Sequence, residues 1–308
     1  LFDSLSIRRR LKKSTHLMGL FDEEFLKKIE YLYVVSKKVF TGKLRAERKT
    51  RKVASGMEFA DHRNYAPGDD FRSLDWRVYG RTEKLLIRLF EEKEDLSIYF
   101  LVDVSGSMKF RDEVKLNYAR KMAAALGYIG LCNQDRVSFC AFNDKVVDRL
   151  PVMSGRGQIF KVFQFLEKLK GDGTTSFEDA FKGFAAQTKR RGVAVILSDF
   201  ENPTGFEKAL NFLHYQQFET YVVHIVDDEM MQTKVYGDVS IVDSETGESV
   251  DITLTPGLMA QYKKLHEALC LKMEAYCVAR HMLYFRTPVS EPFDEIVLKV
   301  FRAGGFLK

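Results

Sequence analysis

The chain has 308 residues, enough for one large domain or for a domain with an appendage. Hydrophobic residues make up 45% and charged residues 30%, an ordinary globular balance, and the formal net charge of +5 is too small to indicate a nucleic-acid-binding protein. The basic character is concentrated near the N-terminus, because residues 1–60 hold 15 Lys/Arg against 7 Asp/Glu.

The four cysteines lie in apolar surroundings, and no pair of them has CxxC spacing. This pattern predicts reduced core thiols rather than a disulfide scaffold. No apolar run approaches the roughly 20 residues that a bilayer span requires, and no apolar segment with a small-residue cleavage site follows the basic start. We therefore expect a cytoplasmic protein with no membrane span and no signal peptide.

Residues 1–84 are expected to form an N-terminal segment that precedes the main domain. Apolar residues at helical spacing predict a helix over 21–38. Residues 43–52, KLRAERKTRK, hold six basic residues and one acid; they form either a solvated arm or a docking surface for an acidic partner or an anionic polymer. Residues 58–77 mix Asp, Arg and aromatic residues around a Pro-Gly-Asp turn. We interpret them as an ion-paired clamp that holds the segment on the main domain, with a second functional site as the alternative.

Strand-like and helical patterns alternate over residues 85–308, the predicted main domain. This alternation predicts an α/β fold, a doubly wound and mostly parallel Rossmann-type sheet with helices on both sides. The run VAVILS is apolar throughout, as expected for a strand that is buried on both faces. The expected strands are 85–90, 96–102, 137–142, 146–152, 193–198, 220–226 and 281–286, with a hairpin over 235–254, and the expected helices are 111–131, 159–169, 177–188, 206–215 and 256–280.

Oxygen-bearing side chains occupy three loops of this expected sheet. The loop in LVDVSGSM follows the strand 96–102, an aspartate follows the strand 193–198, and GDGTTS leads into a helix between them. In an open parallel sheet, ligands gather outside the carboxyl ends of the strands. The three loops therefore meet at one edge if the two strands are neighbours. The candidate ligand residues are Asp103, Ser105, Ser107, Thr174 and Asp199.

Two carboxylates and three hydroxyls are hard oxygen ligands, which suit Mg²⁺, Mn²⁺ or Ca²⁺ better than zinc. They leave one coordination position open for water or for a carboxylate of another protein. A purely structural alternative is that Asp103 and the two serines cap the following helix and that Asp199 is a turn residue. The chain lacks GxSxG, HExxH and P-loop motifs, and Ser105 stands where a haloacid-dehalogenase-type phosphotransferase has its second aspartate.

The order DxSxS, threonine, aspartate resembles the metal-ion-dependent adhesion site of von Willebrand factor A domains. In that family the two serines usually bind the metal directly, the threonine binds directly or through water, and the aspartates often act through water. The resemblance implies the same roles here, for a divalent cation that is Mg²⁺ or else Mn²⁺ or Ca²⁺. Thr174 matches the pattern best, and the adjacent Thr175 is the alternative ligand.

A longer stretch, residues 55–108, resembles the hallmark segment of the bacterial domain-of-unknown-function family fifty-eight. Its members place a von Willebrand A-like domain after such an Asp/Arg-rich segment, and SEPFDEIVLKVFR at 290–302 is also similar to the family. Many relatives carry membrane-spanning helices, which this sequence lacks. The family's frequent genomic association with MoxR-type AAA+ ATPases implies a chaperone-like or assembly partnership.

Together these features predict a non-enzymatic, metal-dependent protein-binding module. A carboxylate of a protein partner, for example a MoxR-type AAA+ ATPase, is expected to complete the coordination of the metal. Two alternatives remain. One is a Mg²⁺-dependent phosphohydrolase that uses the same loops, with Asp172 as the nearby acid–base candidate. The other is a binder of nucleic acid or of an anionic surface that works through the basic N-terminal region.

Overall fold

The computed structural model describes residues 19–40, 51–52, 58–91, 97–202, 205–228, 237–242 and 248–302. The chain divides into two compact units, a larger one formed by residues 1–36 and 96–306 and a smaller one formed by 37–95 with 307–308. The expectations for residues 1–18, and for most of the basic stretch 43–52, lie outside the described residues.

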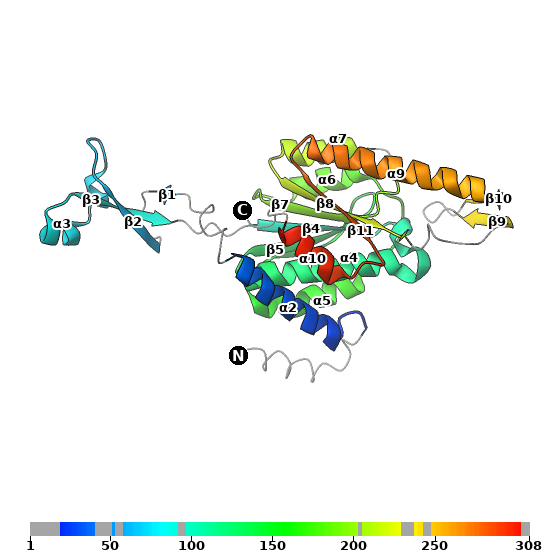
Figure 1. Ribbon diagram of the computed structural model, residues 1–308, viewed down its shortest axis with the longest axis horizontal. Helices are drawn as coiled ribbons and strands as arrows, with labels where there is room; N and C mark the ends of the chain where they lie inside the picture. The colour runs from blue at the N-terminus through cyan, green and yellow to red at the C-terminus, as the bar shows by residue number, and fades with distance from the viewer. Residues whose placement is uncertain are drawn as a thin grey trace. The chain divides into compact units, whose positions relative to one another are not determined.

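A six-stranded sheet forms the centre of the larger unit (Figure 1). The strand order is β11-β8-β7-β4-β5-β6; the neighbours from β11 to β5 are parallel, and β6 is antiparallel to β5. The predicted α/β fold with a mostly parallel sheet is therefore confirmed. The strands are β4 (Ser97–Asp103), β5 (Arg136–Phe142), β6 (Val146–Met153), β7 (Val193–Ser198), β8 (Glu219–Val226) and β11 (Leu283–Pro288).

Helices cover both faces of this sheet, with α2, α4, α5 and α10 on one side and α6, α7 and α9 on the other (Figure 1). Every residue of β4 and β7 is buried, because these central strands have helices above and below them. The helices are α2 (Glu23–Phe40), α4 (Gly106–Cys132), α5 (Ile159–Lys168), α6 (Phe177–Ala186), α7 (Phe206–Tyr215), α9 (Pro256–Val278) and α10 (Phe293–Arg302), with a 3-10 turn η2 (Arg156–Gln158).

The predicted N-terminal helix is α2, and its apolar stripe faces the larger unit. The ring of Phe21, just before the helix, stacks on Phe163 of α5 at a centroid distance of 4.6 Å, and Phe25 lies 5.1 Å from Phe293 of α10. Ile29 continues the stripe and is also buried. The helix is therefore packed into the larger unit by aromatic contacts with two helices from distant parts of the chain.

The smaller unit contains a three-stranded antiparallel sheet in the order β1-β3-β2. The sequence analysis assigned β3 to the main domain, so the predicted boundary at residues 84–85 lies within the smaller unit. The elements are β1 (Arg51–Lys52), β2 (Glu58–Asn64), η1 (Phe71–Ser73), α3 (Trp76–Thr82) and β3 (Leu86–Glu91).

Ion pairs order the turn and the helix of the smaller unit. The guanidinium of Arg63 donates two hydrogen bonds to the carboxylate of Asp69, at 2.7 and 2.6 Å, and Asp69 also accepts from the backbone N–H of Ala66. Asp75 caps the N-terminus of α3 and pairs with His62 at 2.9 Å. The charged side chains of this segment thus form ion pairs and hydrogen bonds with one another inside the smaller unit.

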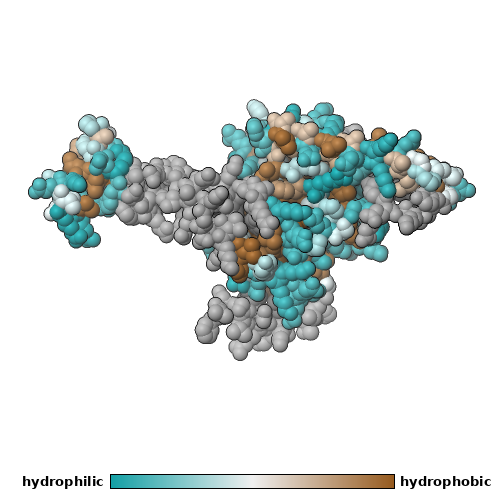
Figure 2. Space-filling model, in the orientation of Figure 1, coloured by the Kyte–Doolittle hydropathy of each residue, from teal (hydrophilic) through white to brown (hydrophobic). Residues whose placement is uncertain are grey.

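An antiparallel hairpin of β9 (Gly237–Val242) and β10 (Ser249–Leu254) precedes α9, as the sequence predicted, and its turn lies outside the described residues. Helix α9 is mostly hydrophilic on the side that Figure 2 shows, with apolar residues scattered among the polar ones. The part of the chain that the structure describes contains no helix that is long and apolar enough to cross a membrane.

Gly127 marks the closest approach of α4 to the sheet. A Cβ atom at this position would lie 2.5 Å from Cζ of Phe139, a fully buried ring that stacks on Phe100. We expect Gly127→Ala to lower the free energy of unfolding by about 1–3 kcal/mol, because the added methyl group forces a buried, stacked ring to shift. Urea unfolding followed by far-UV circular dichroism measures this change.

Gly183→Ala in α6 is the matched control, since its Cβ would meet Val146 at an ordinary 3.6 Å. Its higher helix propensity predicts a gain of up to about 1 kcal/mol. If Gly127→Ala were as stable as the wild type or more stable, the close packing at Gly127 would be refuted.

The Arg63–Asp69 pair predicts an acid-sensitive smaller unit. Hydrogen bonds from Arg63 and Ala66 lower the pKa of Asp69 to about 2. Because the folded pKa is depressed, the stabilisation is complete above the unfolded pKa near 4 and is lost as the pH falls towards 2. We expect Asp69→Asn to remove this part of the pH dependence, and the fluorescence of Trp76, the single tryptophan, reports on this unit.

The exposed Glu83 offers a matched control, and Glu83→Gln is expected to retain the wild-type acid transition. A wild-type transition in Asp69→Asn would show that other carboxylates control it.

Candidate metal centre

The two aspartates of the candidate site lie at the same edge of the sheet. Strands β4 and β7 are adjacent and parallel, and Val102 pairs with Leu197 near their carboxyl ends. Asp103 is the last residue of β4, and Asp199 comes two residues after Leu197. The two strands are therefore neighbours, as is required for the loops that follow them to meet at one edge of the sheet.

Backbone hydrogen bonds join the glycine-rich loop to the DxSxS loop. The N–H of Asp172 donates to the carbonyl of Val104 at 2.8 Å, and the N–H of Gly106 donates to the carbonyl of Gly173 at 2.9 Å. A Cβ atom at Gly171 would lie 2.8 Å from Lys109 Cβ, so only glycine allows this approach. Thr174 lies on this loop with an exposed side chain.

The hydroxyls of Ser105, the N-cap residue of α4, and Ser107, in its first turn, form a chain that leads to Asp199. Ser105 is the N-cap residue of α4 but makes no side-chain capping bond. Its Oγ lies 3.0 Å from Oγ of Ser107, which donates to Oδ1 of Asp199 at 3.2 Å. All three side chains are buried. The capping alternative for Ser105 is therefore excluded, and the hydroxyls form one chain with the carboxylate.

Asp103 is a fully buried carboxyl group next to a second carboxylate. Its Oδ2 accepts a 2.5 Å hydrogen bond from Ser198 Oγ, and its Oδ1 accepts from the N–H of Ser105 at 2.9 Å. Burial, together with the negative charge of Asp199, raises the pKa of Asp103 to about 7. Two ionised carboxylates therefore repel each other here unless a cation lies nearby.

Lys115 supplies one such cation from within the chain. Its buried Nζ lies 2.6 Å from Asp199 Oδ2 and 2.6 Å from Glu201 Oε1. Burial alone would lower the pKa of Lys115, but the two carboxylates raise it above its ordinary value, so the ammonium stays charged. Sequence analysis missed this residue, since a lysine within a helical pattern reads as a surface residue.

A left-handed turn lies near the start of α4, and the helix begins before residue 111, where the sequence predicted its start. The φ angles of Arg111, Asp112 and Glu113 are 52°, 56° and 62°. This conformation costs about 1–2 kcal/mol for each residue that is not glycine. Arg111 offsets part of this cost, because its Nη1 donates to both carboxylate oxygens of Asp227 at 2.8 and 2.9 Å. The helix begins before this turn, at Gly106, and Lys115 follows it.

The backbone of Asp199 is held from the opposite side. Its carbonyl accepts a 2.9 Å hydrogen bond from Nε2 of the buried His224, and burial lowers the pKa of that imidazole to about 4. The next residue, Phe200, has a left-handed φ of 49° and is fully buried. The hydrogen bond from His224 holds the backbone of Asp199 in place, while Ser107 and Lys115 contact its carboxylate.

The donor chemistry of the site fits a hard divalent cation. Two carboxylates and two hydroxyls are buried together, and the carboxylates carry mutual repulsion that Lys115 relieves on the Asp199 side. Oxygen ligands of this kind suit Mg²⁺ or Mn²⁺. The structure brings Asp103, Ser105, Ser107 and Asp199 together through hydrogen bonds with one another or with Ser198, whereas Thr174 stays exposed on the joined loop.

Comparison with known proteins places these residues in a family. Residues 61–268 match the model of a family described as "Protein of unknown function DUF58". The chain is 25% identical over 214 residues to the uncharacterized protein Rv1480 of Mycobacterium tuberculosis, covering 68% of this chain and 67% of that protein. It is 35% identical over 57 residues to the uncharacterized protein YeaD of Bacillus subtilis, covering 18% of this chain and 14% of that protein.

Two solved structures are also similar in part. BatB from Bacteroides thetaiotaomicron aligns with a TM-score of 0.44 at 15% identity, over 67% of this chain and 98% of that chain. An aerotolerance-related membrane protein from Bacteroides fragilis aligns with a TM-score of 0.43 at 16% identity, over 67% of this chain and 97% of that chain.

The burial of Lys115 predicts a large cost for removing its charge. We expect Lys115→Met to lower the free energy of unfolding by about 3–5 kcal/mol, because it leaves Asp199 as an uncompensated buried charge. Far-UV circular dichroism during urea unfolding, in a chelating buffer, gives the value.

Glu201→Gln tests the other half of the same ion pair. The Glu201 side chain is 48% exposed, so this change is expected to cost no more than about 1 kcal/mol. Similar losses in the two variants would mean that the buried Lys115–Asp199 contact is not the dominant one.

Proposed function

The chain belongs to the DUF58 family, whose function is unknown, and we propose that it is a non-enzymatic protein-binding module that depends on a divalent metal ion. The observation that carries this proposal is the buried chain of hydroxyls and carboxylate from Ser105 through Ser107 to Asp199, beside a second buried carboxylate. The Ser105 hydroxyl makes no side-chain capping bond to α4 and belongs to this chain instead.

The residues resemble the metal-ion-dependent adhesion site of a von Willebrand A-like domain, and we assign their roles on that pattern. Ser105 and Ser107 would hold the ion directly, Asp103 and Asp199 would support it, and Thr174 would approach from the glycine-rich loop. Bound Mg²⁺ supplies a positive centre with one coordination position that the chain itself does not fill.

A carboxylate from a protein partner is the ligand that we propose for the open position. The family resemblance points to a MoxR-type AAA+ ATPase as this partner. Electrostatic attraction between the bound ion and an acidic side chain makes recognition dependent on the metal, since the carboxylates of the site repel an acidic partner otherwise.

The acid–base groups near the site favour binding over catalysis. Lys115 is held in two ion pairs, both ring nitrogens of His224 are hydrogen-bonded, and Oδ1 of Asp172 accepts from the N–H of Gly173. A general acid or base must be able to exchange a proton with a bound substrate. The contacts of Lys115 and His224 count against such a role for these two residues, whereas the exposed Asp172 remains the acid–base candidate of the phosphohydrolase alternative.

Partner capture tests the proposal. Immobilised wild-type protein is expected to retain a MoxR-type ATPase from the same organism in Mg²⁺ and to lose it in a chelator. Asp103→Ala is expected to lose it in both conditions, because the ion is no longer held. Equal capture in all four conditions would refute the proposal.

Thermal unfolding of the same samples separates metal binding from partner binding. Mg²⁺ or Mn²⁺ at about 100 times the dissociation constant should stabilise the wild type by about 2.7 kcal/mol. Ser107→Ala should lose this effect, whereas Ser154→Ala, at an exposed serine of the larger unit, should retain it. The same preparations test the phosphohydrolase alternative. We expect them to show no metal-dependent hydrolysis of a generic phosphate ester. If the wild type hydrolysed the ester and Asp103→Ala did not, the phosphohydrolase would be favoured instead.

A further inference from the structure

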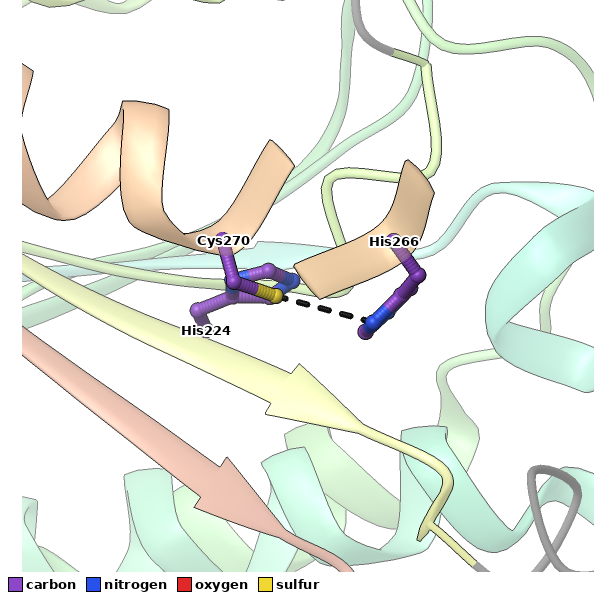
Figure 3. Close-up of side chains that lie close together, drawn as sticks. All are labelled: His224, His266 and Cys270. Atoms are coloured by element: carbon purple, nitrogen blue, oxygen red, sulfur yellow. Dashed lines mark hydrogen bonds between the residues drawn. The ribbon is translucent and has the colours of Figure 1, made fainter. Parts of the chain in front are cut away.

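A second group of metal-ligating side chains lies between α9 and the sheet. His266 and Cys270 are one turn apart on α9 and point towards His224 on β8 (Figure 3). One ligand atom from each of the three residues lies within 4.8 Å of the others. His224 and Cys270 are buried and His266 is half-buried, so the site is sheltered but has a route to solvent on the His266 side.

Hydrogen bonds fix which nitrogen of His224 carries the lone pair. The carbonyl of Asp199 can only accept, so Nε2 of His224 is the protonated nitrogen. Nδ1 therefore carries the lone pair and accepts from the hydroxyl of Tyr284 at 2.7 Å; an ion bound to Nδ1 would take this lone pair in place of the hydrogen bond. An imidazole whose second nitrogen donates to a backbone carbonyl is the usual arrangement of a metal-ligating histidine.

The separation of the two donors on α9 is close to that expected for ligands of a tetrahedral ion. Sγ of Cys270 lies 3.7 Å from Nδ1 of His266. Zn–S and Zn–N bonds of about 2.3 and 2.0 Å place two ligand atoms about 3.5 Å apart at the tetrahedral angle. The Tyr284 hydroxyl is a hydrogen-bond partner of both His224 and Cys270, so it faces the same point from β11.

Nearby positive charges do not prevent a cation from binding here. Arg286, the cation of the adjacent strand β11, is paired with the carboxylate of Glu267 at 2.8 Å. Lys115, on α4, is paired with Asp199 and Glu201. Binding also converts the Cys270 thiol to a thiolate, and its proton passes to solvent, so the site gains a negative charge as the ion enters.

From this geometry we propose that His224, His266 and Cys270 form a second metal site, which takes a borderline-soft divalent ion of the zinc class. Nitrogen and sulfur donors select such an ion over Mg²⁺, and three protein ligands leave a fourth position for a water. This site differs from the oxygen site in both ligand type and metal class, and it does not depend on the proposed binding function.

Cobalt, which absorbs visible light where zinc does not, is the probe. The full-length protein is titrated with Co²⁺ in excess Mg²⁺, so that the oxygen site is occupied. We expect saturation at one equivalent, with a thiolate-to-cobalt charge-transfer band and tetrahedral d–d bands that Zn²⁺ abolishes. Absence of these bands would overturn the proposal.

Two matched pairs of variants assign the ligands. Cys270→Ala should abolish the charge-transfer band, whereas Cys277→Ala, two turns further along the same helix, should retain it. His266→Gln should weaken Co²⁺ binding by about tenfold or more, whereas His214→Gln, at an exposed histidine of α7, should not. A band that survives Cys270→Ala would overturn the assignment.

A measurement on the unchanged protein covers the case in which Cys270→Ala does not fold. Wild-type protein is alkylated in mild denaturant with or without one equivalent of Zn²⁺, and the modified cysteines are identified by mass spectrometry. Zn²⁺ should slow the alkylation of Cys270 relative to that of Cys277. Equal rates at the two cysteines in both conditions would overturn the proposal.

Discussion

The burial of two carboxylates at the ends of neighbouring parallel strands is the constraint on which the rest of the site depends. Pairing of β4 with β7 brings Asp103 and Asp199 to one edge and removes both from water. A buried carboxylate costs several kcal/mol unless hydrogen bonds and opposite charge offset it. Ser198, Ser107 and the ammonium of Lys115 meet that cost only in part, since the pKa of Asp103 remains raised to about 7. The left-handed turn in α4 lies directly before this part of the helix in the sequence.

Asp199 also connects the two candidate sites. Its carboxylate belongs to the oxygen cluster, and its backbone carbonyl accepts from His224 of the nitrogen–sulfur cluster. An ion on Nδ1 of His224 would polarise the ring and strengthen the hydrogen bond to that carbonyl. Any effect of one site on the affinity of the other must be reciprocal, because coupling is a property of the pair. The connection consists of one hydrogen bond and one residue, so a shift of the loop after β7 affects both sites at once.

The sequence predicted what depends on local pattern and strand order. The alternation of strand-like and helical segments predicted the mostly parallel sheet. The DxSxS motif after one strand and an aspartate after a later strand predicted that Asp103 and Asp199 lie at the same edge of the sheet. The sequence did not predict Lys115, whose position depends on three residues in a conformation that no propensity favours. The His224 cluster was equally hidden: two ligands are one helical turn apart on α9, but the third is on a strand more than 40 residues earlier. Only the packing of α9 on β8 and β11 brings them together, and the spacing alone is shared by many ordinary helices.

Under the proposed function, charge balance is the reason why the oxygen site would recognise an acidic partner only with a metal ion bound. With Asp103 ionised, the site holds the carboxylates of Asp103, Asp199 and Glu201 against the single ammonium of Lys115. A further carboxylate from a partner would enter a field that is already negative, and repulsion at close range costs several kcal/mol. A divalent cation cancels the excess and leaves one coordination direction that an anion can complete. A monovalent cation such as a second lysine could not do both, so the charge of the ion, rather than the shape of the loops, makes such binding conditional.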